Sequence, residues 1–172
     1  MVANFEETAR TSIETQMQYL DFGMSMVSAE AMQMRLDTEL QSLANGLFKN
    51  DLSKASSIYR KNASNIKVRQ RSNELINAIY IIPKSGSKVM STLESSDQSA
   101  DGYYEKWAET EEGQKVIYEK NVIDWLGKST AWVGSHPQMD ALTGYHQDDY
   151  AISYMSAFPN RAAVFIVDIS KE

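Results

Sequence analysis

The chain of 172 residues contains no cysteine. This absence excludes a disulfide framework, a thiolate nucleophile, and any zinc or iron–sulfur site that needs cysteine ligands. Long hydrophobic runs are also lacking, because no apolar stretch approaches the ~20 residues that a membrane-spanning helix needs. No basic-then-apolar signal segment opens the chain. We therefore expect one water-soluble domain of ordinary size, with a core large enough to fold without disulfides.

An excess of positive charge is lacking as well. The formal net charge is -6, and residues 87–172 hold 14 of the 23 acidic residues. One basic run lies between Asp51 and Glu74, where Tyr59 is the only aromatic residue. Nucleic-acid sites favour positive charge interleaved with aromatic rings, so we expect no nucleic-acid partner and interpret the run as a solvated helix face. The run comprises Lys54, Arg60, Lys61, Lys67, Arg69 and Arg71.

The first 48 residues contain no proline and predict one long helix. Apolar residues recur there with alternating spacings of four and three, which is the heptad pattern of a coiled-coil seam. At ~1.5 Å per residue, such a helix is ~70 Å long and exceeds the width of a compact domain of this size. Part of it must therefore project or pair with another chain, and we predict a parallel homodimer. The predicted seam comprises Ile13, Met17, Leu20, Met24, Val27, Ala31 and Met34.

The next segments change from a helical to a strand-like pattern. Residues 52–68 predict a second helix with its N-cap at residue 50 or 51. Residues 75–82 are apolar on both faces and rich in isoleucine, which predicts a buried strand. Residues 83–86 predict a turn, and residues 88–93 then return as the second strand of a hairpin.

The remaining chain predicts three helices and one strand. The helices are expected at residues 103–107, at residues 111–133 with Thr110 as a cap, and at residues 149–158. Residues 162–169 contain Val-Phe-Ile-Val and form the most strand-like run of all. We therefore predict an α+β fold in which the long N-terminal helix packs on a PAS-like antiparallel sheet. The alternative is a helical bundle.

No arrangement of residues in the sequence points to catalysis or to a metal ion. His136 and His146 are the only histidines, and their spacing does not place both on one ion from a single helix. We interpret them as surface loop histidines beside helix-capping aspartates. Gly-x-Ser-x-Gly and the phosphate-binding glycine motifs are absent. We therefore expect no enzyme activity, no metal and no cofactor, with an active site dispersed along the chain as the open alternative.

Aromatic residues concentrate in the acidic half of the chain. Residues 103–154 contain nine of the seventeen aromatic residues and all three tryptophans. Rings amid Asp and Glu suit a pocket in which the rings bury a small ligand and the carboxylates orient its cationic groups. The alternative is that these rings only pack the helices onto the sheet. The predicted ligand-binding residues are Tyr103, Tyr104, Trp107, Trp125, Trp132, Tyr145, Asp149 and Tyr150.

The order of the predicted elements resembles that of Cache domains, the PAS-like extracytoplasmic sensor domains of bacterial methyl-accepting chemotaxis receptors and sensor histidine kinases. Residues 73–86, Asn-Glu-Leu-Ile-Asn-Ala-Ile-Tyr-Ile-Ile-Pro-Lys-Ser-Gly, look like their first hairpin. Residues 132–153, which include His-Pro-Gln-Met-Asp, are similar to their pocket-side helices, and residues 162–170 resemble their central third strand. On this resemblance, residues 1–70 form a long signalling helix plus a second helix, and residues 71–172 form the sensor part.

The resemblance implies a small extracellular ligand and a helix that carries the signal through flanking membrane segments, outside this chain, to a cytoplasmic chemotaxis or kinase module. The implied location is the extracytoplasmic side of the cell membrane. Amino-acid-binding members place an Arg where Lys106 stands here, and Lys matches a carboxylate less well. Their sheet has five strands, whereas this sequence predicts three, so we expect a truncated sheet or a covered edge. The alternative function is a helical module that assembles partners through its seam.

Overall fold

The computed structural model describes residues 2–85, 89–92, 103–118, 130–137, 140 and 150–171. Helices and strands are both present, so the α+β prediction is confirmed and the helical-bundle alternative is wrong. Five antiparallel strands form one sheet in the order β2-β1-β5-β4-β3. The strands are β1 (Ile76–Pro83), β2 (Met90–Ser91), β3 (Thr130–Val133), β4 (Tyr150–Ala157) and β5 (Ala163–Ser170).

Strand β5 lies at the centre of the sheet because it pairs with β1 along one edge and with β4 along the other. Its β-branched and aromatic residues favour a strand, as the sequence predicts. Every residue from Ala163 to Ile169 is buried. Since consecutive side chains of a strand point to opposite faces, β5 contributes to two hydrophobic cores, one on each face of the sheet.

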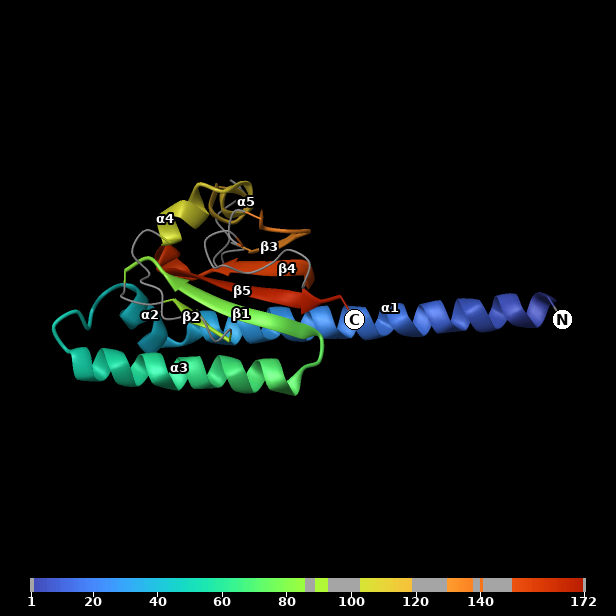
Figure 1. Ribbon diagram of the computed structural model, residues 1–172, viewed down its shortest axis with the longest axis horizontal. Coiled ribbons are helices and arrows are strands. Elements are labelled where there is room, and N and C mark those ends of the chain that lie inside the picture. The colour runs from blue at the N-terminus through green and yellow to red at the C-terminus, as the bar shows by residue number, and fades with distance from the viewer. Residues whose placement is uncertain are drawn as a thin grey trace.

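Three helices cover one face of the sheet (Figure 1). Val27 and Ala31 of the first helix are fully buried in the core that Phe165 of β5 shares. The Tyr59 hydroxyl of the third helix donates a 3.1 Å hydrogen bond to the carbonyl of Val89, which ties that helix to the start of β2. These helices are α1 (Val2–Leu36), α2 (Thr38–Ala44) and α3 (Leu52–Ser72).

The prediction of one helix over the first 48 residues is wrong at its C-terminal end, because the helix breaks at Asp37. The Asp37 carboxylate accepts a 2.8 Å hydrogen bond from the Leu40 N–H and so caps the separate helix α2. α2 ends in a Schellman motif, in which the Gly46 N–H donates to the Leu43 carbonyl. Gly46 adopts a φ of +75° there. The chain then turns back, and α3 runs beside α1 (Figure 1).

Two shorter helices, α4 (Tyr103–Ala108) and α5 (Glu111–Tyr118), lie on the opposite face of the sheet (Figure 1). Trp107 of α4 is fully buried in a second core that includes Ile166 of β5. Thr110 caps α5 as predicted, because its Oγ1 accepts a 3.0 Å hydrogen bond from the Gly113 N–H. Asp51 likewise caps α3 by accepting from the Lys54 N–H. The sheet therefore lies between two helical layers.

Two segments that the sequence predicts as helical are strands. Residues 130–133, the end of the predicted helix 111–133, form the edge strand β3, and residues 150–157, within the predicted helix 149–158, form β4. Residues 153–157 are buried without interruption, so this part of β4 lacks the polar–apolar alternation that reveals a half-exposed strand in a sequence. The expectation that the sheet ends after a third strand is therefore wrong, since β3 and β4 complete it.

Helix α1 extends well beyond the sheet, and its predicted seam falls into two parts (Figure 1). Gly23 lies where the helix meets Leu75, the residue before β1, because a Cβ at Gly23 would stand 2.0 Å from the Leu75 Cδ1. On the sheet side of this point, the seam packs into the protein's own core through Val27, Ala31 and Met34. Met24 is half-buried. The exposed seam residues on the other side are Ile13, Met17 and Leu20.

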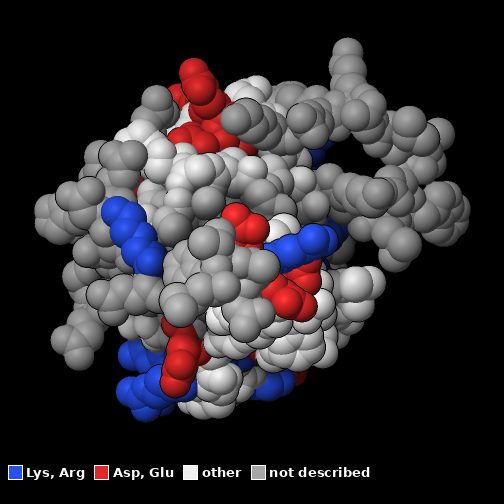
Figure 2. Space-filling model, turned by 90° about the vertical axis from the view of Figure 1, so that its right-hand side faces the viewer, with Lys and Arg blue, Asp and Glu red and all other residues white. Residues whose placement is uncertain are grey.

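The projecting end of the molecule carries side chains of both charge signs. Seen from that end, acidic and basic side chains of the described residues are interspersed, and neither sign forms a continuous patch (Figure 2). Although α1 has 35 residues, it is not apolar enough to cross a membrane, and the same holds for the other helices in the described part of the chain.

Replacing Gly46 with Ala tests the turn that places α3 beside α1. An L-residue at positive φ is strained, and the new Cβ would stand 2.6 Å from the Ser85 Oγ. We expect the free energy of unfolding, measured by urea denaturation, to fall by about 1–2 kcal/mol. Gly134→Ala is the matched control, because a Cβ there has no neighbour within 4 Å. Equal stability of both variants and the parent would contradict the role of this turn.

Candidate functional site

A cluster of polar side chains is buried on the sheet face that carries α4 and α5. Its base is formed by Asp168 of β5 and Ser153 of β4, which are direct partners in the antiparallel register. Both residues are completely buried. The Ser153 hydroxyl donates a 2.5 Å hydrogen bond to Asp168 Oδ1. Asp168 lies on this face because it continues the alternation of Val164 and Ile166, which belong to the same core.

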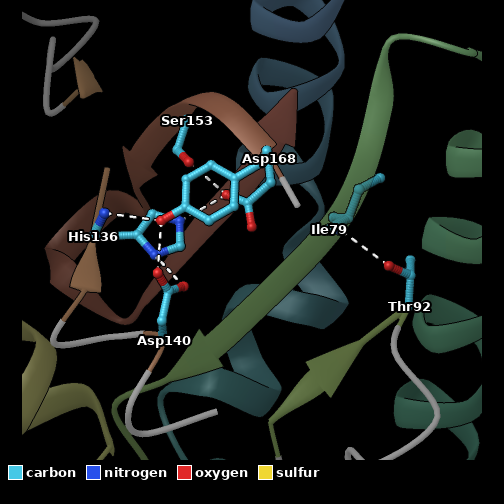
Figure 3. Close-up of polar contacts among 7 residues, drawn as sticks. Ile79, Thr92, His136, Asp140, Ser153 and Asp168 are labelled. Atoms are coloured by element: carbon cyan, nitrogen blue, oxygen red, sulfur yellow. Dashed lines mark hydrogen bonds and ion pairs between the residues drawn. The ribbon is translucent and has the colours of Figure 1, made fainter. Parts of the chain in front are cut away.

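His136 lies in the segment that follows β3 and belongs to the same cluster (Figure 3). Its Nε2 lies 2.7 Å from Asp168 Oδ1, the oxygen that also accepts from Ser153. Its Nδ1 lies 3.0 Å from Asp140 Oδ1, and the geometry of this second contact is that of an ion pair rather than of an aligned hydrogen bond. The imidazole is 1% exposed and therefore stands between two carboxylates away from water.

Tyr150, the first residue of β4, completes the cluster. Its hydroxyl accepts a 2.9 Å hydrogen bond from the His136 N–H and donates a 2.8 Å hydrogen bond to Asp140 Oδ2. Its ring stacks on the His136 ring with centroids 4.5 Å apart and planes inclined by 16°. One phenol thus fixes the backbone and ring of His136 and one carboxylate oxygen of Asp140.

The electrostatics of the cluster favour a charged histidine. Burial alone would lower the pKa of His136, but contacts with Asp140 and Asp168 outweigh it and raise the pKa to about 10. The pKa of Tyr150 is raised, first by burial and further by Asp140 and Asp168. Two acidic side chains, Asp140 and Asp168, thus face a single basic side chain in the cluster. A buried site with this balance favours a ligand that brings positive charge or N–H donors.

The arrangement offers an acceptor for such a ligand. Asp168 Oδ2 is buried and has no hydrogen-bond partner among the described residues. The indole Nε1 of Trp107, on the same face of the sheet, also has none within the described ranges. Buried polar atoms of this kind normally find a partner, so an unpaired carboxylate oxygen marks a place where a donor can bind.

The described contacts do not form a nucleophile and base pair. The Ser153 hydroxyl donates its hydrogen bond to Asp168, and His136 contacts that carboxylate instead of the serine oxygen. A serine nucleophile needs the opposite arrangement, in which the imidazole accepts the hydroxyl proton. Groups of three or more potential metal-binding residues are likewise absent from the described part of the chain.

The structure brings together only some of the predicted ligand-binding residues. Tyr104 and Trp107 are buried on the cluster's face of the sheet, with ring centroids 5.5 Å apart, and Tyr150 is part of the cluster. Trp132 is different, because it packs on Tyr154 toward the α1 side of the sheet. Tyr103 lies in α4, but its side chain is not described. The predicted residues outside the described ranges are Trp125, Tyr145 and Asp149.

Sequence reasoning missed four residues of the cluster, namely His136, Asp140, Ser153 and Asp168. The interpretation of His136 as a surface loop histidine is wrong, because the ring is buried. Asp168 carried the clearest available signal, since it is the one charged residue within the apolar run of β5. A charge in a strand that is buried on both faces needs a partner of opposite charge.

Comparisons of this chain with protein-family models, with curated proteins and with solved structures find no match. Its function is therefore argued from the geometry of the cluster and of α1.

The stability of the protein should depend on pH through His136. The pKa of this residue is about 10 in the folded state and ordinarily 6.5, so its charge stabilises the fold fully below about pH 6.5. We expect the free energy of unfolding to fall on the order of 3–5 kcal/mol between pH 6.5 and 10. Denaturant titrations at each pH measure this fall, and His136→Gln should flatten it. An unchanged slope in that variant would show that other groups cause the dependence.

Tyr150→Phe tests the hydrogen bonds of the phenol while its ring is kept. The change removes the hydroxyl that accepts from the His136 N–H and donates to Asp140, and both hydrogen bonds are buried. We expect a loss of about 2–3 kcal/mol in the free energy of unfolding, since two buried groups lose a partner. Tyr59→Phe is the comparison, because it removes the hydrogen bond to the Val89 carbonyl and should cost about 1 kcal/mol. A cost at Tyr150 no larger than that at Tyr59 would contradict the network.

Proposed function

We propose that this protein is an extracytoplasmic ligand-sensing domain of a transmembrane receptor, of the Cache type found in chemoreceptors and sensor kinases. Two features support the proposal. The resemblance implies five strands, and the sheet has five antiparallel strands. It also implies a long N-terminal helix packed on that sheet, which α1 provides.

The observation that carries the proposal is that β4 and β5 connect the buried cluster to α1. Ser153 and Asp168 lie on the α4–α5 face of these two strands. On the other face, Val167 and Ile169 of β5 belong to the core that contains Val27 of α1. A displacement of β5 at Asp168 therefore moves a strand that contacts α1. No further element is needed between the cluster and the projecting helix.

The ligand we propose is a small cationic or zwitterionic molecule. Its donor binds Asp168 Oδ2, the carboxylate oxygen without a hydrogen-bond partner among the described residues, and its positive charge balances the two acidic side chains of the cluster. The rings of Tyr104 and Trp107 supply apolar and aromatic surface on the same face. The ligand acts by stabilising one position of β4 and β5 over another, because only differential binding shifts a conformational equilibrium.

The second candidate function is a structural module that assembles partners through α1. The observation in its favour is the exposed apolar row on the projecting part of the helix, formed by Ile13, Met17 and Leu20. A module that only assembles partners gains nothing from a buried cluster with an unpaired carboxylate oxygen, because buried unpaired polar groups reduce stability. The two candidates differ in whether the α4–α5 face binds a small molecule.

A thermal-shift screen with amines, amino acids, small carboxylates and nucleobases separates the two candidates. For a ligand at 100 times its dissociation constant, we expect about 2.7 kcal/mol of added stability and a higher melting temperature. Asp168→Asn should reduce the affinity at least tenfold, because it replaces the acceptor carboxylate with an amide of the same shape. Glu105→Gln is the matched control, since this carboxylate on α4 is exposed.

Binding is measured by calorimetry on variants whose circular dichroism matches that of the parent. Alanine at Trp107 or Tyr150 is unsuitable here, because both side chains are buried in the fold itself. A ligand whose affinity is unchanged by Asp168→Asn would overturn the proposed site. A screen without any stabilising compound would favour the assembly module.

A further inference from the structure

Three loops meet at the end of the molecule that lies opposite the N-terminus of α1 (Figure 1). They connect α2 to α3, follow β1, and join β4 to β5. The Ser85 N–H donates a 3.1 Å hydrogen bond to the carbonyl of Ala44, which joins the first two loops. The Lys84 N–H donates one of 2.8 Å to the carbonyl of Ala162, which joins the last two. With their adjoining residues, the loops comprise residues 44–54, 83–85 and 158–163.

Two leucines of this surface point into solvent. Leu47 is 72% exposed and Leu52 is 78% exposed, the two highest fractions among the large apolar side chains of the described residues. Phe48 lies between them in sequence and is half-buried, with Lys54 Nζ 4.7 Å from its ring centroid. Exposed apolar groups that are rimmed by polar ones mark an interaction site.

Positive charge surrounds the leucines. The three loops hold four basic residues, all exposed, and one acidic residue. The acidic one, Asp51, accepts a hydrogen bond from the Lys54 N–H and caps α3. Lys49 lies beside Ser85, because a Cβ at Gly46 would stand 2.6 Å both from the Lys49 Cε and from the Ser85 Oγ. We call this surface the loop face. Its members are Leu47, Lys49, Leu52, Lys54, Lys84 and Arg161.

Arg161 occupies a strained position in the turn between β4 and β5. Its φ is +56°, and that of Asn160 is +57°. Asparagine visits this left-handed region because its short side chain can hydrogen-bond locally, whereas arginine lacks this advantage and glycine has no strain at all. Backbone strain that is kept in a fold points to a use of the residue that bears it. Since the Arg161 side chain is exposed, this use lies at the surface.

We propose that the loop face binds an acidic segment of another protein, in which carboxylates flank an apolar side chain. The leucines then form the apolar centre of the interface. The lysines and the arginine form its polar rim, where opposite charge speeds the encounter and sets the orientation. This inference goes beyond the proposed function and does not rest on it, because the loop face shares no residue with the buried cluster.

The loop face fits other partners less well. A second copy of the chain would place basic residues against basic residues in a two-fold contact, and like charges repel. An anionic membrane would take up the leucines together with the exposed Asp51, which a negative headgroup layer repels. A polyanion would use the positive charge but not the leucines. An acidic and apolar protein segment uses both.

Selection from a random peptide library, with the full chain as bait at low salt, tests the chemistry of the partner. We expect the enriched sequences to share an apolar residue flanked by Asp or Glu. Fluorescence polarisation of synthetic peptides with these sequences should show roughly threefold weaker binding when salt is raised to about 200 mM, because salt screens exposed charges. No enrichment, or enriched peptides without acidic residues, would overturn the inference. Binding to phosphatidylglycerol vesicles but to no peptide would assign the loop face to a membrane instead.

Substitution of an exposed leucine locates the binding surface. Leu52→Ser should weaken peptide binding about tenfold, since the apolar centre loses a leucine that binding buries. Val68→Ser is the matched control, because Val68 is 63% exposed on α3 but lies outside the loop face, and its affinity should equal that of the parent. Asp168→Asn should also bind the peptide normally, which separates this result from the proposed function. An equal loss in the Val68 variant would contradict the location.

Arg161→Gly separates recognition from structure. Glycine relieves the strain at positive φ, so the melting temperature should match or exceed that of the parent. Peptide affinity should nevertheless fall about fivefold, because the rim loses one charge pair. Arg60→Gln, which removes an exposed charge on α3, should change neither quantity. A lower melting temperature with unchanged affinity would show that Arg161 serves the turn alone and has no part in the loop face.

Discussion

Strand β5 occupies the middle of the sheet because both of its edges are hydrogen-bonded, to β1 through the pairing of Phe165 with Ile81 and to β4 through the pairing of Phe165 with Ser156. Helices cover both faces of the sheet, so β5 has no exposed face either and its side chains must satisfy two cores at once. The rest of the structure depends on this constraint. α1, α2 and α3 complete one core, and α4 and α5 complete the other.

The same constraint explains why the buried charges form a closed cluster. Asp168 cannot reach water from the centre of the sheet, so its carboxylate needs donors within the fold. Ser153 supplies one from the adjacent strand, and His136 supplies a charged one from the segment after β3. Such a cluster adds little net stability compared with apolar packing, but it fixes the register of β4 on β5 and the position of the segment that carries His136.

Sequence patterns predicted the elements that the residues of the segment itself determine. β1 and β5 are continuous apolar runs, and α3 begins at an aspartate cap, so local physics determines them. β4 was missed because its neighbours, β3 and β5, stabilise a segment of small and mixed residues as a strand by tertiary pairing. The heptad seam of α1 was recognised, but a pattern of apolar residues does not reveal whether its partner is a second helix or the chain's own sheet. The contact of His136 with Asp168 joins positions that are 32 residues apart in sequence, a separation at which spacing carries no information.

His136 is buried between two carboxylates on the α4–α5 face of the sheet, and its contacts favour the charged imidazole. Nuclear magnetic resonance of the imidazole nitrogens measures its charge directly, and His146→Gln leaves His136 as the one histidine to observe. We expect the His136 ring to keep both of its N–H groups well above pH 8, in accord with a pKa of about 10. A ring that loses its proton near pH 6.5, as a free histidine does, would contradict it.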